Sequence, residues 1–530
     1  MKTNTRACRQ CRQGKRRCDG SVGQTCLPCQ KRDLACSAAF KPKPNHVLKA
    51  ADTPDFPTLT GAVDIGNTLA CTDHETVMEI VELYIDYIHD KPHSLFHVPT
   101  LRADVATSTV DTALLCGILA LASRFASTED IRILGPKFAT QMKEDLKRGL
   151  ETVSISRTQA WVLAGNVAGA DSDSMSESLF FGIAIRSAHI LKLGESDPED
   201  GAILRETKSR TWWTLYMIDR WSSAGLGTPR QLGERQASQQ LPLDEYQFHN
   251  HEAGQELWTA STDPGLWAYM ILLAELFGPI QDLNRLIASG NASEQYVSTH
   301  VAQLYSTLQK WQNDLPLQVR LNSETLEYHK SRGHGRTFVA LHLGYFHYTT
   351  LLFFHFLDMS SKATPNSETY AERCRQHASA FSDLLKTSYS MGACEVMYTI
   401  VGHMAVVSSS VLIHTLLFGD EVQLPGARHQ LESNFEILMR LKSWWPSVGQ
   451  MTERLFLFQR ACLRNVDAHT HKIDRWMVKF LLEHAILLSD KSPDGHSEST
   501  SPQDFSEAPE MQRLSERGKF TKNALSGLRA

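Results

Sequence analysis

The stretch that decides the fold of the N-terminal region runs from Ala7 to Cys36 and reads ACRQCRQGKRRCDGSVGQTCLPCQKRDLAC. It contains six of the eleven cysteines of a 530-residue chain. The unit C-x2-C-x6-C occurs twice, and it supplies Cys8, Cys11, Cys18, Cys26, Cys29 and Cys36. The first residues are polar and lack the apolar core of a secretory signal, so we expect metal ligands here rather than disulfide bonds.

Two zinc arrangements are compatible with these six thiols. A tetrahedral zinc ion needs four ligands, which the two C-x2-C pairs could provide, but Cys18 and Cys36 would then have no role. Two ions need eight ligand positions, and six thiolates fill them if two of the thiolates bridge both ions. The duplicated spacing fits this second count. In either arrangement so small a head cannot bury a useful core, and we expect it to fold only with its metal.

Charge is distributed unevenly along the chain. Residues 1–44 contain eleven Lys or Arg and two Asp or Glu, a net charge of +9. The remaining 486 residues carry −14, which gives the overall charge of −5. A basic head on an acidic body indicates that the partner of the head is a polyanion.

The positive charge of the head is densest between the second and third cysteines. Residues Arg12 to Arg17 read RQGKRR, which is long enough for about a turn and a half of helix. Basic side chains on a rigid short helix suit contact with phosphates, and a Lys or Arg at its tip can donate to guanine O6 and N7. A solvated run of charge and a nuclear import signal are the alternative interpretations.

With these residues in view, Cys8 to Cys36 resembles the Zn2Cys6 binuclear cluster, the DNA-binding module of fungal transcription regulators. The resemblance implies two Zn²⁺ ions bridged by Cys8 and Cys26, one completed by Cys11 and Cys18 and the other by Cys29 and Cys36. It implies that Lys15 reads a CGG-type triplet of double-stranded DNA in the major groove. It assigns phosphate contacts or a role in nuclear import to Arg9, Arg12, Arg16 and Arg17.

The rest of the chain divides into three predicted parts. Residues 41–71 are rich in proline and lack apolar periodicity, which predicts a linker that follows the zinc domain of residues 1–40. Residues 72–488 show apolar residues at helical spacing and no strict alternation, which predicts a large all-α domain. Residues 489–530 are rich in Ser, Pro, Asp and Glu at their start, so we expect a disordered tail.

Several apolar stretches support the all-α interpretation. Val77, Val81, Tyr84 and Ile88 fall on one helical face. Further helical stretches are expected near Leu114–Phe125, Leu179–Leu193, Trp212–Ser222, Ala340–Leu357 and Tyr398–Phe418. The last of these belongs to a run of 22 residues without Asp, Glu, Lys or Arg, Tyr398–Gly419, which is long enough to span a bilayer. Because this run contains two histidines and has no flanking basic anchors, we interpret it as a buried central helix.

The helical part also resembles a family domain, the fungal-specific transcription factor (middle homology) region. The resemblance rests on YIHDKPHSLFHVPTL (Tyr87–Leu101), LLCGILALASRFA, SLFFGIAIRSAHILKLG (Ser178–Gly194) and RTWWTLYMIDRWSSAGLGTPRQL (Arg210–Leu232). We expect the motif aromatics Trp212, Trp213 and Tyr216 to pack in the core. The charged motif residues are expected to form buried or interfacial ion pairs rather than a ligand site; they are Arg186, Arg210, Asp219 and Arg220. An effector pocket between the helices is compatible with the pattern.

No catalytic motif is found, so we expect a protein that is not an enzyme. The five cysteines outside the head are scattered and expected to be buried apolar residues; they are Cys71, Cys116, Cys374, Cys394 and Cys462. The sequence predicts a nuclear, zinc-dependent, sequence-specific DNA-binding regulator of genes transcribed by RNA polymerase II, with a metabolic or secondary-metabolite gene cluster as a candidate target. Its other expected partners are the transcription machinery and a second copy bound through the helical domain, with no membrane. The alternative is a zinc-stabilised co-regulator that binds protein and does not read DNA.

Overall fold

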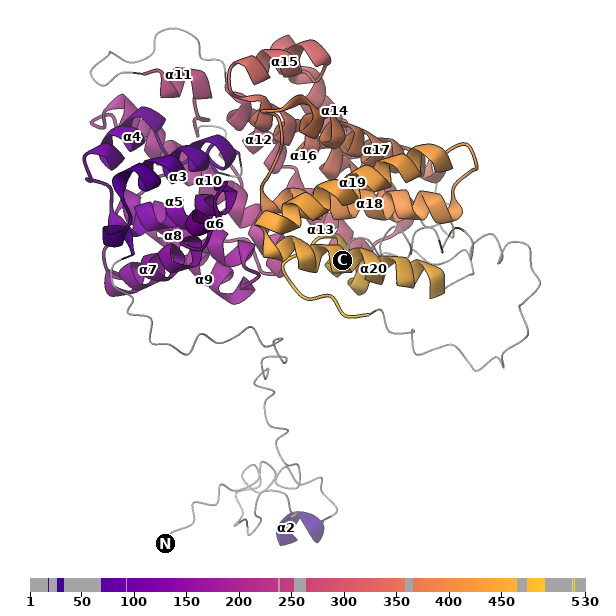
Figure 1. The fold of residues 1–530 in the computed structure, drawn as a ribbon. Helices are drawn as coiled ribbons and strands as arrows, with labels where there is room; N and C mark the ends of the chain where they lie inside the picture. Colours follow the sequence, from indigo (N-terminus) through magenta and orange to yellow (C-terminus); the bar gives the residue numbers. More distant parts are fainter. Residues whose placement is uncertain are drawn as a thin grey trace, which may run out of the picture. The chain divides into compact units, whose positions relative to one another are not determined.

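A computed structural model describes most of the chain (Figure 1). The described residues are Cys18, 26–32, 68–91, 93–236, 239–251, 264–357, 366–464, 474–490, Arg517 and Lys519. The chain divides into two compact units, residues 1–64 and 65–530. In the first unit the described part contains one short helix, α2 (Leu27–Gln30).

The second unit is helical, and no strand occurs in the part of it that the structure describes. Its first elements are η1 Leu69–Cys71, α3 His74–Tyr87, α4 Val98–Ala106, α5 Thr112–Ala122, η2 Ser123–Phe125, α6 Glu129–Arg132, α7 Gly135–Arg148, α8 Ile155–Ala170, α9 Ser174–Ile190 and α10 Ala202–Leu226. The next are α11 Glu245–His249, α12 Leu266–Ala274, α13 Phe277–Ala288, α14 Glu294–Asp314, η3 Leu317–Val319 and α15 Ser323–Ser331. The last are α16 Gly335–Phe353, η4 Phe354–Leu357, α17 Ser367–Met391, α18 Thr399–Phe418, α19 Leu424–Trp444, α20 Pro446–Arg464 and α21 Arg475–Leu481.

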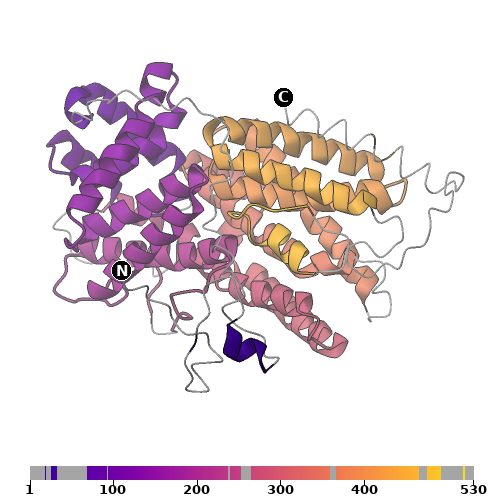
Figure 2. The same cartoon turned by 90° about the horizontal axis from the view of Figure 1, so that it is seen from below.

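Within this unit the helices form two neighbouring groups. Helices α3, α5, α7, α8 and α9 pack on one another, whereas α16 to α20 form a second group. Both views show the indigo and purple helices of the first group on one side and the orange helices of the second group on the other (Figures 1 and 2). The long helix α10 contacts α8 and α9 of the first group as well as α12 and α13, which in turn contact α16 of the second group.

Local signals explain where many of the helices begin. Asp73 caps α3 by accepting a hydrogen bond from the backbone N–H of Thr76 at 2.9 Å. Asn322 and Thr325 form a reciprocal capping box at the start of α15. Helix α10 ends at Gly227, whose φ of 65° lies in the left-handed region that glycine adopts without strain.

The helical stretches expected from the sequence are present. The four residues of the first predicted face, Val77, Val81, Tyr84 and Ile88, are all buried along α3 and at its end. Trp213 and Tyr216 lie in the core as expected, while Trp212 is only partly buried against it.

The uncharged run that is long enough to span a bilayer forms α18. Among the residues that the structure describes, two helical stretches could cross a membrane by length and composition, Leu266–Ala288 and Thr399–Phe418. Of the apolar window in each, 67% and 94% respectively are buried inside the unit. Helix α18 contacts α16, α17, α19 and α20, which cover it, and residues 401–417 of α18 are buried. It is therefore the buried central helix that the sequence predicts.

Two expectations need comment. Cys116, Cys374, Cys394 and Cys462 are buried as predicted, but Cys71 is exposed at the end of η1, so the prediction was wrong for this residue. The expected linker and tail lie mostly outside the described residues. Within the tail, Arg517 donates hydrogen bonds to the carbonyls of Leu417 and Gly419 at the end of α18.

Candidate functional site

The described part of the head places two cysteines in one short helix. Cys26 is the N-cap of α2, and its carbonyl accepts the backbone N–H of Cys29 at 3.0 Å. Both cysteines are only 1% exposed, whereas the side chain between them, Leu27, is 57% exposed. The thiols therefore point inward while the leucine, which is normally among the most buried residues, points outward.

This arrangement fits a metal centre. A helix of four residues cannot persist alone, because nucleating the first turn costs more than one hydrogen bond returns. Two thiols three residues apart on one helical turn lie on the same side and can reach one zinc ion as thiolates. Cys18, the third described cysteine of the head, is half-buried. The other predicted ligands and DNA contacts lie outside the described residues; they are Cys8, Cys11, Cys36, Arg9, Arg12, Lys15, Arg16 and Arg17.

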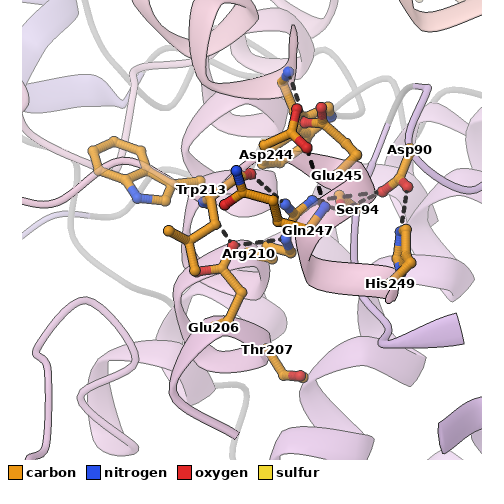
Figure 3. Close-up of polar contacts among 12 residues, drawn as sticks. Asp90, Ser94, Glu206, Thr207, Arg210, Trp213, Asp244, Glu245, Gln247 and His249 are labelled. Carbon is orange, nitrogen blue, oxygen red and sulfur yellow. Dashed lines mark hydrogen bonds and ion pairs between the residues drawn. The ribbon is translucent and has the colours of Figure 1, made fainter. Parts of the chain in front are cut away.

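The helical unit contains a second polar site, which centres on Arg210 of α10 (Figure 3). The Arg210 guanidinium is fully buried. It donates from Nε to Glu206 at 2.8 Å, from Nη1 to the Ser94 hydroxyl at 2.8 Å and from Nη2 to the carbonyl of Leu243 at 2.7 Å. Its Cζ also lies 4.6 Å from the ring centre of Phe248. These partners come from three separate parts of the chain, so Arg210 ties the segments before α4 and α11 to α10.

Burial and neighbouring charges have opposite effects on the pKa values in this cluster. Burial lowers the pKa of Arg210, but the carboxylates of Glu206 and Asp90 raise it more, so the net pKa lies above its usual value. Burial also raises the pKa of Glu206, and this effect exceeds the opposing effect of Arg210. The guanidinium therefore remains charged, and its carboxylate partners depend on it for compensation.

Asp90 connects this arginine to a group of histidines. Its Oδ1 accepts the Ser94 hydroxyl at 2.5 Å and lies 3.3 Å from Nδ1 of His89, while its Oδ2 lies 2.7 Å from Nε2 of His249. Arg210 Nη1 is 3.7 Å from Oδ1. Burial raises the pKa of Asp90, but His89 and His249 lower it more, and the result lies well below the usual range.

The histidines act here as hydrogen-bond donors to Asp90. Nε2 of His89 accepts the backbone N–H of Phe96 at 3.0 Å, and Nδ1 of His249 accepts that of Val98 at 3.4 Å. A nitrogen that accepts a hydrogen bond carries no proton, so in each ring the N–H is on the nitrogen that faces Asp90. His89, Asp90 and His249 are close enough to hold a metal ion. However, metal binding would place a proton on the opposite ring nitrogens, against backbone N–H groups, so the donor set fits a hydrogen-bonded carboxylate better than a metal.

The other charged motif residues have different surroundings. Asp219 accepts the backbone N–H groups of Gln231 and Leu232, at 2.9 and 2.8 Å, and so fixes the loop after α10. Arg220 is buried and donates to the carbonyl of Gly233 at 3.0 Å, with an ion pair to Glu234 at 3.3 Å. Arg186 is exposed. The prediction of a buried ion pair is confirmed for Arg210. Arg220 is buried, but its partner Glu234 is 66% exposed, and Asp219 binds backbone instead.

Sequence reasoning missed the partners of Arg210. Asp90 and Ser94 belong to the segment HDKPHSLFH, which forms part of a family motif but for which no hydrogen-bond partners were predicted. The composition of this segment could have indicated a polar cluster. A charged and histidine-rich segment between two apolar helices needs buried hydrogen-bond partners. Which arginine would satisfy it depends on a contact 116 residues away along the chain, and local pattern does not show that.

Burial also makes Glu245 sensitive to pH. Its carboxylate accepts the backbone N–H groups of Leu266 and Trp267, at 3.0 and 2.9 Å, and so caps α12 from a different helix. Burial raises the pKa of Glu245 to about 7. The unfolded value is near about 4.3, so between these values the folded state binds more protons and stability falls as the pH rises.

We expect the substitution Glu245→Gln to remove this contribution. The neutral amide can still accept a backbone N–H, so the variant should resemble the protonated wild type. The stability of the wild type relative to the variant should fall between about pH 4 and about pH 7. Urea unfolding followed by tryptophan fluorescence measures the difference. Glu294→Gln, an exposed change on α14, is the control and should leave the curve parallel to the wild type; a parallel Glu245→Gln curve would contradict the assignment.

Comparison with known proteins assigns the helical unit to a class. Residues 81–313 match the family described as fungal specific transcription factor domain. The chain is 24% identical over 455 residues to the Zn(2)-C6 fungal-type transcription factor FTF2 of Fusarium oxysporum f. sp. lycopersici, which covers 77% of this chain and 42% of the relative. It is 23% identical over 445 residues to the Zn(2)-C6 fungal-type transcription factor FTF1a of the same fungus. This match covers 75% of this chain and 40% of the relative. An uncharacterised transcriptional regulatory protein of Schizosaccharomyces pombe is 23% identical over 317 residues. This match covers 53% of this chain and 32% of the relative.

These matches support a regulator of transcription. The findings support a fungal Zn2Cys6 transcription factor with a fungal-specific transcription factor domain. It spans less than half the length of the relatives named above. Those relatives are named as regulators rather than enzymes, which agrees with the expectation of a protein without catalytic function.

Proposed function

We propose that the chain is a zinc-dependent regulator that binds a specific DNA sequence in the nucleus and controls transcription by RNA polymerase II. The observation that carries this proposal is the burial of Cys26 and Cys29 in a four-residue helix whose leucine is exposed. Inward-facing thiols beside an exposed leucine support a head that folds around metal. Two zinc ions, bound by the six cysteines with Cys8 and Cys26 shared, would give each ion four ligands.

In this mechanism the head reads DNA and the helical unit regulates. Zinc, when bound, would fix the thiolates and the short helices between them, and it takes no part in a reaction. Lys15 would donate to a guanine of a CGG-type triplet, while Arg9, Arg12, Arg16 and Arg17 contact phosphates or serve nuclear import. The helical unit would contact the transcription machinery and would bind a second copy. A metabolic or secondary-metabolite gene cluster is the proposed target.

The substitution Lys15→Ala tests the proposed base contact. It should leave the zinc content unchanged and reduce discrimination between CGG and altered triplets by about 1–3 kcal/mol. Fluorescence anisotropy with a matched set of duplexes measures this. Arg16→Ala is the matched control, because loss of a phosphate contact should weaken all duplexes equally and reduce the salt dependence. Equal weakening of all duplexes by Lys15→Ala would refute its role as the base-reading residue.

The salt dependence also separates the two proposed classes of function. If the head binds phosphates, its affinity should fall steeply as salt concentration rises, because counterions are released on binding. A co-regulator that binds protein through an apolar interface should show a shallow salt dependence and no preference among duplexes.

A further inference from the structure

Helix α9 has an apolar face on its outer side. Its inner side packs on α8 and α10, and Phe180 and Phe181 are buried there. On the outer side Met175, Leu179 and Ile190 are 82%, 61% and 60% exposed. Figure 1 shows α9 at the edge of the first group of helices. Because surface helices normally turn a polar face to water, the apolar outer face of α9 indicates contact with another molecule.

The outer residues of α9 form one continuous stripe, which covers about a third of the helix circumference at 3.6 residues per turn. Isolated apolar side chains are ordinary on a protein surface, whereas a continuous apolar stripe marks an interaction site. At its middle lies Gly182, where an added Cβ would meet only Gln231 among the described residues, at 3.8 Å, so a second helix can approach closely. The α9 stripe consists of Met175, Leu179, Gly182, Ile183, Arg186 and Ile190.

Arg186 is the one charged residue of the α9 stripe. It is exposed, and among the residues that the structure describes it makes no ion pair or hydrogen bond. Protein interfaces are enriched in Arg and Met and depleted in Lys, Asp and Glu, which is the composition of this stripe. The aliphatic stem of an arginine can also cover apolar surface while its guanidinium stays in water. Arg186 is therefore compatible with an apolar contact along α9.

The two ends of α9 carry opposite charges. Asp171 and Asp173 precede the helix; Asp173 caps it, and Asp171 is only loosely paired with Arg124, at 4.0 Å. Lys192 follows the helix. Its ion pair with Glu195 spans 3.8 Å between side chains that are both largely exposed, so it contributes little. An acidic start and a basic end make α9 complementary in charge to a reversed copy of itself.

Two copies of α9 that run in opposite directions match along the whole stripe in a single register. A two-fold axis between residues 182 and 183 sets Met175 of one copy against Ile190 of the other. The same axis sets Leu179 against the aliphatic stem of Arg186. By symmetry each of these contacts occurs twice, so all the apolar positions of the stripe are covered.

The charged residues fit the same register. Asp173 of one copy falls opposite Lys192 of the other, at both ends of the contact. A parallel arrangement would instead place each Arg186 beside the other Arg186 and each Asp171 beside the other Asp171, and like charges in an interface are unfavourable. Charge therefore selects the antiparallel arrangement, in which the apolar positions also match.

We propose that the α9 stripe is a self-association surface, on which two copies of the chain pair with their α9 helices antiparallel about a two-fold axis. A contact of this kind uses the same patch on both copies. The inference rests on the proposed binding of a second copy by the helical unit, and it adds the surface responsible. It does not depend on zinc or on DNA recognition by the head. A foreign helix could cover the apolar positions, but the match of charges to a reversed α9 favours a second copy.

Two single variants test the register. Met175→Asp places a carboxylate opposite Ile190 of the second copy, and Ile190→Lys places an ammonium group opposite Met175. Both positions are exposed in one copy, so the helical unit should stay folded, which circular dichroism checks. Val422→Asp is the control, because Val422 is 91% exposed between α18 and α19, away from α9. Analytical ultracentrifugation of the full chain without DNA measures the dissociation constant of the dimer.

The wild type and Val422→Asp should dimerise equally, and each single variant at least about tenfold more weakly, because an unpaired charge enters an apolar contact. An equimolar mixture of Met175→Asp and Ile190→Lys should recover dimers. In a mixed pair the introduced charges meet at one end, and Met175 meets Ile190 at the other.

Three results would each overturn the proposal: a monomeric wild type, unchanged dimerisation of a folded Met175→Asp variant, or a mixture no more dimeric than its components. Dimers that follow these expectations while the head binds no DNA would support the proposal and contradict the proposed function of the head.

Discussion

Replacing Cys29 by serine is expected to remove zinc from the head and to reduce its affinity for specific DNA by about a thousandfold or more, to the non-specific level. Serine has nearly the volume of cysteine, so the change tests the thiolate rather than packing. A head of this size has no apolar core to hold it once a ligand is lost. Metal analysis of the purified full chain, together with DNA-binding titrations, measures both effects.

The exposed Cys71 supplies the control for this experiment. Because Cys71 lies in η1, outside the cysteine-rich head, Cys71→Ser should keep the zinc content and DNA affinity of the wild type. The wild type should contain two zinc ions per chain. A single ion in the wild type, with no loss on Cys18→Ser, would favour the four-thiolate site built from the two C-x2-C pairs. A Cys29→Ser variant that kept both ions would contradict the proposal.

The second large effect is expected at Arg210. Arg210→Met should lower the free energy of unfolding of the helical unit by about 3–5 kcal/mol, because it leaves the buried carboxylates of Glu206 and Asp90 without their charged partner. Methionine keeps much of the apolar contact that the arginine stem makes. Urea unfolding of the full chain, followed by tryptophan fluorescence and circular dichroism, measures the change.

Two further variants separate charge from packing. Arg186 is exposed in the neighbouring helix α9, so Arg186→Met should change stability by no more than about 0.5 kcal/mol. The double variant Glu206→Gln with Arg210→Met should recover part of the loss, because it removes one of the two unpaired carboxylates. If Arg210→Met alone cost less than about 1 kcal/mol, the ion pairs would not be the main interaction in this cluster.

How much of this could be predicted from the sequence depends on the range of the interaction concerned. The face of α3 follows from spacing alone, because Val77, Val81 and Tyr84 recur at helical intervals. The N-cap residues Asp73 and Asn322 likewise mark the starts of α3 and α15, because capping depends only on residues close in the sequence. The cysteine spacing likewise predicts a metal-binding head without any knowledge of the fold.

Features that arise from distant contacts could not be predicted. Glu206 and Arg210 are neighbours on α10, but Ser94 and Leu243 reach the arginine only through tertiary packing. The exposure of Cys71 depends on what packs over η1, and residue type does not determine it.

The position of α18 has a consequence for how the chain is made. Two of the helices that cover it, α19 and α20, are synthesised after it, so the ribosome releases its uncharged surface before that cover exists. During this interval the nascent segment has the length and apolarity that membrane-insertion machinery and chaperones recognise. A chain truncated between α18 and α20 would lack helices that cover α18, so its apolar surface would stay exposed. We expect such a product to aggregate or be degraded.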